Sequence, residues 1–140
     1  MAIRRREGRI LAMQFLYQHD LHAPENRAEA LLEFWEMTEA THALRVYAGE
    51  LIEGVLTHQA DLDRLIQRYA QNWNVERISA VDRNILRLAL YEMYHRLDVP
   101  PVVAINEAID IAKKMGSEES GGFINGILDR AKLEVNRALR

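Results

Sequence analysis

Proline placement is the feature that most constrains the fold of this sequence. Prolines occur only at positions 24, 100 and 101, and no stretch alternates apolar and polar residues as a half-buried strand would. Long segments therefore remain in which a helix can run without interruption, because a proline inside a helix removes a hydrogen bond and clashes with the preceding turn. The sequence predicts an all-α fold of about seven helices.

Apolar residues recur every three to four positions along each of these segments, which is the spacing of one helix face. Ser79 is a predicted N-cap with Asp82 in the capping-box position, and Ser117 is a predicted N-cap of the last helix. Gly116 fits the C′ position after the preceding helix. The predicted helices cover residues 5–20, segments beginning near 24 and 41, and residues 60–71, 80–97 and 101–115, followed by a segment beginning near 117.

The composition limits the cellular compartment and the kinds of site that this chain can have. Cysteine is absent, which excludes a disulfide framework, a thiolate metal site and a cysteine nucleophile. The N-terminal apolar stretch is broken by Gln14 and Gln18, unlike the apolar core of a signal peptide. No apolar run approaches the roughly 20 residues that span a bilayer. We therefore expect a soluble cytoplasmic protein without membrane association.

Patterns typical of catalysis and metal binding are also missing. No phosphate-cradling glycine loop, nucleophile elbow or dinucleotide fingerprint occurs. His19 and His22 flank Asp20, but no further ligand of a zinc site is evident. Glu92 and Glu107 lack a partner that would organise a reaction, and helix-edge salt bridges explain them better. The sequence thus predicts neither an enzyme nor a cofactor or metal site.

An arginine cluster opens the chain. Residues 4–9, RRREGR, contain four arginines, whereas the rest of the chain carries 14 basic and 20 acidic residues. A charge run of this kind is ordinarily a solvated tail. Here it continues directly into an apolar helix, which holds part of it in a fixed geometry. The acidic remainder would confine nucleic acid to this patch.

An aromatic side chain accompanies the arginines. Arg6, Arg9, Met13 and Tyr17 follow roughly one helical stripe, so Tyr17 can stand in line with the guanidinium groups. Guanidinium forks for phosphates and a ring for stacking are typical of proteins that bind single-stranded nucleic acid. Three or four phosphate contacts give a log–log salt slope of only roughly −2 to −3. A second component would therefore be needed for useful affinity.

The segment SGGFINGILD begins the last predicted helix with two glycines followed by Phe123. Two interpretations remain open. In the first, Gly121 and Gly122 permit tight packing around a buried Phe123. In the second, Phe123 is a stacking platform beside a helix N-terminus, whose free N–H groups attract phosphate.

Several blocks of the sequence resemble the NusB family of bacterial transcription antitermination factors. They are RRREGRILAMQFLYQ near the N-terminus, and DRNILRLALYE, INEAIDIAKKMG and FINGILD in the C-terminal half. The resemblance extends from Arg4 to Leu133. Residues 21–57 match in helical pattern rather than in residue identity.

The resemblance implies an all-helical fold of two packed three-helix units, approximately 1–72 and 73–140, within one domain. It implies no catalysis. It also implies binding to the single-stranded boxA element of nascent RNA, chiefly in ribosomal RNA leaders. That binding would occur together with NusE, a small-subunit ribosomal protein. The pair would then join RNA polymerase in an antitermination complex.

The family's site residues carry over to nine positions of this sequence. Its basic motif falls on Arg4, Arg5, Arg6 and Arg9, its RNA-contacting aromatics match Tyr17 and Phe123, and Gln14 lies nearby. Glu119 matches an acidic residue that tunes RNA affinity by repulsion, and Asp82 lies on the surface expected to face NusE. The arginines and the two rings are expected to converge on one exposed strip.

The broad apolar helix faces leave one alternative open, which is a helical protein-interaction adaptor or homodimer without an RNA role. The two readings differ in what Arg5 and Arg6 do. RNA binding that is lost when both are replaced by alanine supports the first reading.

Overall fold

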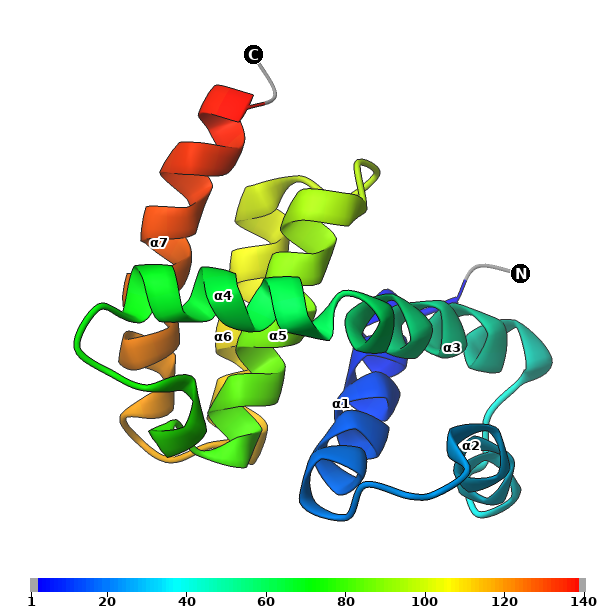
Figure 1. The fold of residues 1–140 in the computed structure, drawn as a ribbon. Helices are drawn as coiled ribbons and strands as arrows, with labels where there is room; N and C mark the ends of the chain where they lie inside the picture. Colours follow the sequence, from blue (N-terminus) through cyan, green and yellow to red (C-terminus); the bar gives the residue numbers. More distant parts are fainter. Residues whose placement is uncertain (1–2, 139–140) are drawn as a thin grey trace. The chain divides into compact units, whose positions relative to one another are not determined.

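The computed structural model describes residues 3–138, with side chains as far as Val135. This part of the chain contains seven α-helices and one short 3-10 helix but no strand, so the prediction of an all-α fold is confirmed (Figure 1). The helices are α1 (Arg5–Leu21), α2 (Arg27–Glu36), α3 (His42–Thr57), α4 (Gln59–Ala70), the 3-10 helix η1 (Val75–Arg77), α5 (Ala80–His95), α6 (Pro101–Met115) and α7 (Ser120–Ala138).

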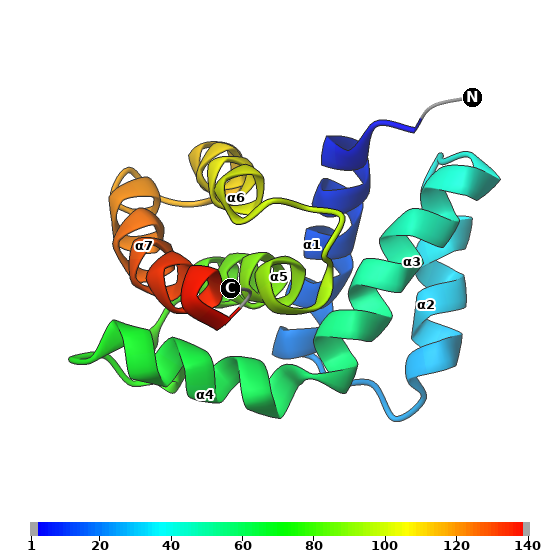
Figure 2. The same ribbon diagram turned by 90° about the horizontal axis from the view of Figure 1, so that it is seen from above.

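The chain divides into two compact units, Met1–Gly54 and Val55–Arg140. The first holds α1, α2 and most of α3, which are the blue to cyan helices of Figure 2. Phe15 of α1 packs edge-on against Phe34 of α2, with ring centroids 5.5 Å apart. An ion pair of 3.1 Å between Arg27 and Glu53 joins α2 to α3. Aromatic packing and one exposed ion pair thus connect these helices.

In the second unit α5, α6 and α7 pack against one another, and α4 crosses α5 and α7 (Figure 1). Pro101 occupies the first turn of α6, where its missing N–H leaves no hydrogen bond unmade. Apolar stripes of all four helices meet in the core, as the periodicity predicts. Its fully buried side chains include Leu62, Ile66, Ile85, Leu86, Leu90, Ile124 and Leu128.

The predicted division near Asn72–Asn74 falls inside the second unit, because α4 is bound to α5 and α7 by polar contacts. Asp63 of α4 accepts hydrogen bonds from Arg87 of α5 at 2.7 and 2.9 Å. The hydroxyl of Tyr69, near the end of α4, donates to Glu134 of α7 at 2.6 Å. Sequence pattern alone does not reveal these pairings, since the partners lie 24 and 65 residues apart.

Helix ends follow local chemistry at some positions and tertiary packing at others. The Ser79 hydroxyl accepts from the backbone N–H of Asp82 at 3.2 Å, so the predicted N-cap of α5 is confirmed. Ser117 does not cap α7, which begins three residues later; its own N–H donates to the Ser120 hydroxyl at 2.9 Å. Gly116, predicted to follow the preceding helix, does end α6 as its C-cap, but its φ of −97° is not the left-handed conformation common for such a glycine. A Cβ there would lie 2.5 Å from the Ser120 hydroxyl oxygen.

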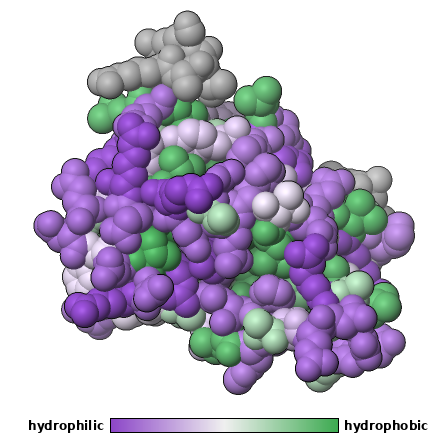
Figure 3. Space-filling view, viewed as in Figure 1, coloured by the Kyte–Doolittle hydropathy of each residue, from purple (hydrophilic) through white to green (hydrophobic). Residues whose placement is uncertain are grey.

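Exposed large apolar side chains occur in both units, among them Leu32 and Met37 in the first and Leu97 and Leu133 in the second. On the face shown in Figure 3 polar residues predominate, and apolar ones form separate small areas. Leu97, the last residue of the helix predicted over 80–97, is 78% exposed because α5 has ended at His95. Between residues 3 and 138 no helix has both the length and the apolar character needed to cross a membrane.

Candidate nucleic-acid interface

Three exposed arginines stand at the start of α1. Arg4 precedes the first helical turn with an extended backbone, and Arg5 and Arg6 lie within that turn. Arg4 contacts Glu7 at 3.5 Å, with side chains 83% and 52% exposed. An exposed ion pair of this kind contributes at most about 1 kcal/mol. An incoming phosphate can therefore displace Glu7 at little cost.

The guanidinium of Arg5 lies over a buried ring. Its central carbon is 5.7 Å from the centroid of the Tyr47 ring of α3. Gly8 allows the Tyr47 ring to lie against α1, because a Cβ at that position would collide with two carbons of the ring. A cation over an aromatic face is attracted by the ring quadrupole. The contact holds Arg5 near the surface while leaving the residue exposed.

Arg9 differs from the other three arginines. It is only 3% exposed, and Met13, one turn further along α1, is fully buried. The stripe of Arg6, Arg9, Met13 and Tyr17 therefore does not form an exposed line, although its helical spacing is correct. The exposed arginines of this cluster are Arg4, which precedes α1, and Arg5 and Arg6 in its first turn.

Gln14 and Tyr17 lie one turn apart on α1, further along from the arginines. Gln14 is exposed, and Tyr17 is half-buried. A half-buried ring keeps a fixed orientation and still offers part of its face or edge to solvent. Both residues are therefore placed to contact a ligand that reaches this part of the helix.

In the second unit Glu119 and Phe123 stand at the start of α7. Glu119 is exposed, and its carbonyl accepts from the N–H of Phe123 at 3.1 Å. Phe123 is half-buried and packs edge-on against Trp73, with ring centroids 5.9 Å apart. Phe123 is therefore not the fully buried core residue of the packing interpretation.

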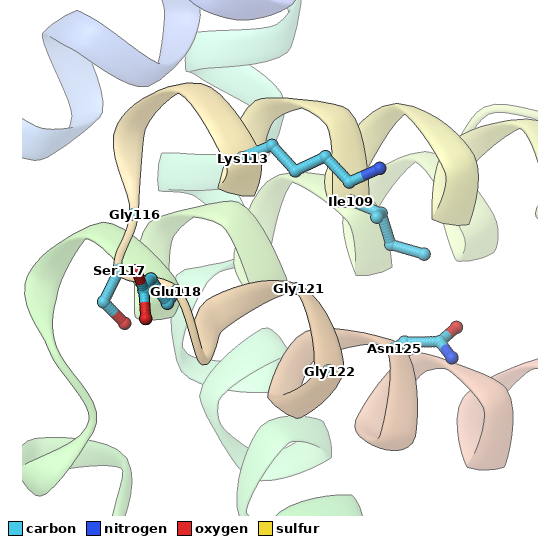
Figure 4. Close-up of a pocket in the computed structure, with 8 residues that line it drawn as sticks. All are labelled: Ile109, Lys113, Gly116, Ser117, Glu118, Gly121, Gly122 and Asn125. Carbon is cyan, nitrogen blue, oxygen red and sulfur yellow. The ribbon is translucent and has the colours of Figure 1, made fainter.

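The two glycines that follow Ser120 border an open hollow of about 540 Å³ between α6 and α7 (Figure 4). A Cβ on Gly122 would meet nothing within 4 Å, and one on Gly121 would only touch Ile109 at 4.0 Å. Tight packing therefore does not require either glycine. Lys113 and Glu118 line the same hollow with opposite charges, so it is not a strongly cationic pocket.

Asp82 lies in the first turn of α5. Its backbone N–H is used by the Ser79 cap, and its side chain is partly buried. Among the described residues its Oδ1 atom has no hydrogen-bond partner. A buried carboxylate oxygen without a partner is costly, and a donor from a bound protein would remove that cost.

The nine predicted site residues belong to two separate units. Arg4 to Tyr17 lie in the first unit, and Asp82, Glu119 and Phe123 lie in the second. Convergence of all of them on one strip stays a prediction. Within the described residues no group of three or more histidine or acidic side chains is arranged to hold a metal ion.

Comparison with known proteins assigns this chain to a family. The model described as "NusB family" matches residues 6–132. The chain belongs to the NusB family. Members of the NusB family are transcription antitermination factors and not enzymes.

Relatives in the NusB family match nearly the whole chain. The transcription antitermination protein NusB of Myxococcus xanthus is 43% identical over 138 residues, which is 95% of this chain and 97% of that protein. The NusB protein of Geobacter sulfurreducens is 46% identical over 125 residues, 89% of this chain and 91% of its own. The family resemblance inferred from the sequence blocks is therefore confirmed.

Solved NusB structures share the fold. T. maritima NusB superimposes with a TM-score of 0.85 at 38% identity, covering 96% of this chain and 94% of that chain. A complex of the antitermination factors NusB and NusE with double-stranded RNA contains a chain that matches with a TM-score of 0.82 at 27% identity. This match covers 93% of the present chain and 96% of the other.

Sequence reasoning missed three residues beside the candidate site, namely Tyr47, Trp73 and Arg130. Tyr47 lies in an apolar stripe and gave no signal of its contact with Arg5. Trp73 did give one, because it is an aromatic residue within the polar run QNWN, outside any helical stripe. Arg130 borders the hollow beside Phe123, a contact that depends on the path of the chain.

Proposed function

We propose that this chain binds the boxA RNA of nascent ribosomal RNA leaders together with NusE and joins the RNA polymerase antitermination complex. It would act in the cytoplasm, where transcription and the ribosomal protein NusE meet. No catalysis is part of this role. Membership of the NusB family supports the class of function, and the related complex with NusE and RNA supports the two kinds of partner.

One observation carries the RNA-binding part of the proposal. Three exposed arginines begin α1 in a chain whose net charge is −3. Guanidinium groups bind phosphate through paired N–H donors, and the acidic remainder of the chain disfavours binding elsewhere. Three phosphate contacts give a salt slope of roughly −2 for a single strand. RNA affinity at physiological salt therefore depends on NusE.

The proposed roles follow from residue chemistry and exposure. Phosphate contacts fall to the exposed arginines, stacking to the half-buried rings, and a base-edge contact to an exposed amide. Arg9 remains in the family's motif, but its burial favours support of α1 over direct phosphate contact. The assignments are Arg4, Arg5 and Arg6 for phosphates, Tyr17 and Phe123 for bases, Gln14 for a base edge, Glu119 for repulsion and Asp82 for NusE.

A fluorescence-anisotropy titration with labelled boxA RNA across a range of salt tests the proposal. Arg6→Ala should reduce the magnitude of the salt slope by roughly 0.7. Arg64→Ala is the matched control, because Arg64 is also exposed but lies on α4, and it should leave the slope unchanged. Addition of NusE should raise the affinity for boxA over scrambled RNA. A titration with a duplex RNA of the same sequence shows whether the chain prefers single-stranded or double-stranded RNA.

The adaptor or homodimer alternative makes the opposite prediction. Equal binding to boxA and scrambled RNA, with or without NusE and with no loss in Arg6→Ala, would refute the RNA-binding proposal. Gel filtration of the chain alone and with NusE then separates a homodimer from an adaptor.

A further inference from the structure

An exposed tryptophan stands in the loop between α4 and η1. Trp73 is 52% exposed, yet one side chain holds the backbone at Trp73 and again at Val75, two residues further on. The Gln67 amide donates to the Trp73 carbonyl at 2.8 Å and accepts from the N–H of Val75 at 3.2 Å. A large aromatic surface is therefore presented to solvent from an anchored loop. Because the loop is already ordered, stacking of a partner on the indole costs little conformational entropy.

The indole borders a hollow of about 250 Å³ that it shares with Phe123. The two rings meet edge-on, with an interplanar angle of 75°. Gly122 and Gly126 line the same hollow, and a Cβ on either would meet nothing within 4 Å. The space beside the rings is open because no side chain projects from these two positions.

A guanidinium group stands at the edge of this hollow. Arg130 lines it, and the Arg130 Nη1 atom donates to the backbone carbonyl of Tyr69. That hydrogen bond fixes the orientation of an otherwise exposed cation. A phosphate attached to a group in the hollow would lie within the field of Arg130.

A second hollow of about 250 Å³ also has Trp73 in its wall. Its other lining residues are a cation and four amides, namely Arg77, Gln67, Gln71, Asn72 and Asn74. Amide side chains both donate and accept hydrogen bonds, which is the chemistry needed to read the edge of a nucleobase. Gln71 has a φ of 51°, a conformation that costs energy in a residue other than glycine.

We propose that Trp73 is a stacking platform for one unpaired nucleotide of the bound RNA. The amides of Gln71, Asn72 and Asn74 read the edge of its base, whereas the Gln67 amide anchors the loop. Arg77 and Arg130 flank the nucleotide's phosphates. Every base has a π-face that can stack on an indole, and Arg adds a cation to such a site. This inference rests on the proposed RNA-binding function and adds a nucleotide position to it.

Charge indicates that stacking rather than phosphate attraction dominates at this position. Arg77 follows Glu76 and Arg130 follows Asp129 in the sequence, and all four residues are exposed. Each cation thus has an acidic neighbour that weakens its field. Loss of the indole should lower RNA affinity while leaving the salt slope unchanged. Loss of an α1 arginine should change the slope.

Tryptophan fluorescence provides a direct test, because the chain contains only two tryptophans. Trp35→Phe leaves Trp73 as the only one, and it should be quenched when single-stranded boxA RNA binds with NusE present. The matched control, Trp73→Phe, leaves Trp35 of α2 and should show no quenching. Trp73→Ala should weaken RNA binding by roughly 5- to 100-fold, with the salt slope of the wild type.

The outcomes separate this inference from the proposed function. RNA binding of normal affinity without any change in Trp73 emission would refute the stacking platform and leave the RNA-binding function intact. A change in Trp73 emission with NusE alone, and none on RNA addition, would show a protein contact and refute the inference. Absence of RNA binding by both the wild type and Trp35→Phe would refute both proposals.

Discussion

The ion pair between Asp63 and Arg87 connects α4 to α5, and its removal should strongly destabilise the second unit. The Arg87 side chain is 5% exposed and that of Asp63 is 29% exposed. Two hydrogen bonds, of 2.7 and 2.9 Å, join the guanidinium to the two carboxylate oxygens. Asp63→Ala would remove the carboxylate that accepts both of these hydrogen bonds from the buried guanidinium.

The size of the effect follows from this burial. Removing one partner of a buried ion pair costs about 3–5 kcal/mol. Because water reaches part of Asp63, we expect a loss of about 2–4 kcal/mol in the free energy of unfolding. For a domain of this size that corresponds to a decrease in Tm of roughly 10 °C. A hydrogen bond of 3.2 Å from Arg87 to Asn84 remains in the variant.

Urea unfolding followed by circular dichroism at 222 nm measures the loss. Asp61→Ala is the matched control, because Asp61 also lies on α4 and pairs with Arg64, but both side chains are more than half exposed. It should cost at most about 1 kcal/mol. Equal losses in the two variants would refute the argument from burial.

A double variant separates the two contributions to that loss. Asp63→Ala combined with Arg87→Met removes the buried charge as well as its partner. It should recover at least half of the stability lost in Asp63→Ala. If the double variant is no more stable than the single one, the loss of the carboxylate partner of the buried guanidinium is not the cause.

The structure also predicts how two glycine substitutions and a change in pH affect the free energy of unfolding. Gly8→Ala should cost about 1–3 kcal/mol because its Cβ collides with a buried ring. Gly49→Ala, with nothing within 4 Å of its Cβ, should gain up to about 1 kcal/mol. Thermal unfolding that shows the same sign for both would contradict this. The pKa of His95, an exposed residue, is lowered from 6.5 by partial desolvation of its ring and by His58, which Asp61 partly opposes. The free energy of unfolding should therefore fall as the pH drops below 6.5 and level off below the lowered pKa, since the unfolded state binds the extra proton. His95→Gln should remove this component of the pH profile; an unchanged profile would refute its assignment to His95.

Local sequence chemistry determined most of the secondary structure. The prolines at positions 100 and 101, the Ser79 cap and the apolar periodicity placed α5 and α6 within two residues of their observed limits. These signals act over three or four residues, through hydrogen bonds and steric clashes within one helical turn. The arginine cluster at the start of α1 could also be predicted from the sequence, because charge and helix continuity are local properties.

Tertiary structure decided which of those residues are accessible. Helical spacing put Arg9 in line with Arg6, but packing buried Arg9. Phe123 and Trp73 form an aromatic pair although they lie 50 residues apart, and no periodic pattern relates them. Burial and such distant contacts depend on how whole helices pack, and many arrangements satisfy the same local rules. The sequence thus determines the chemistry of each side chain, whereas the tertiary structure determines its burial and its neighbours.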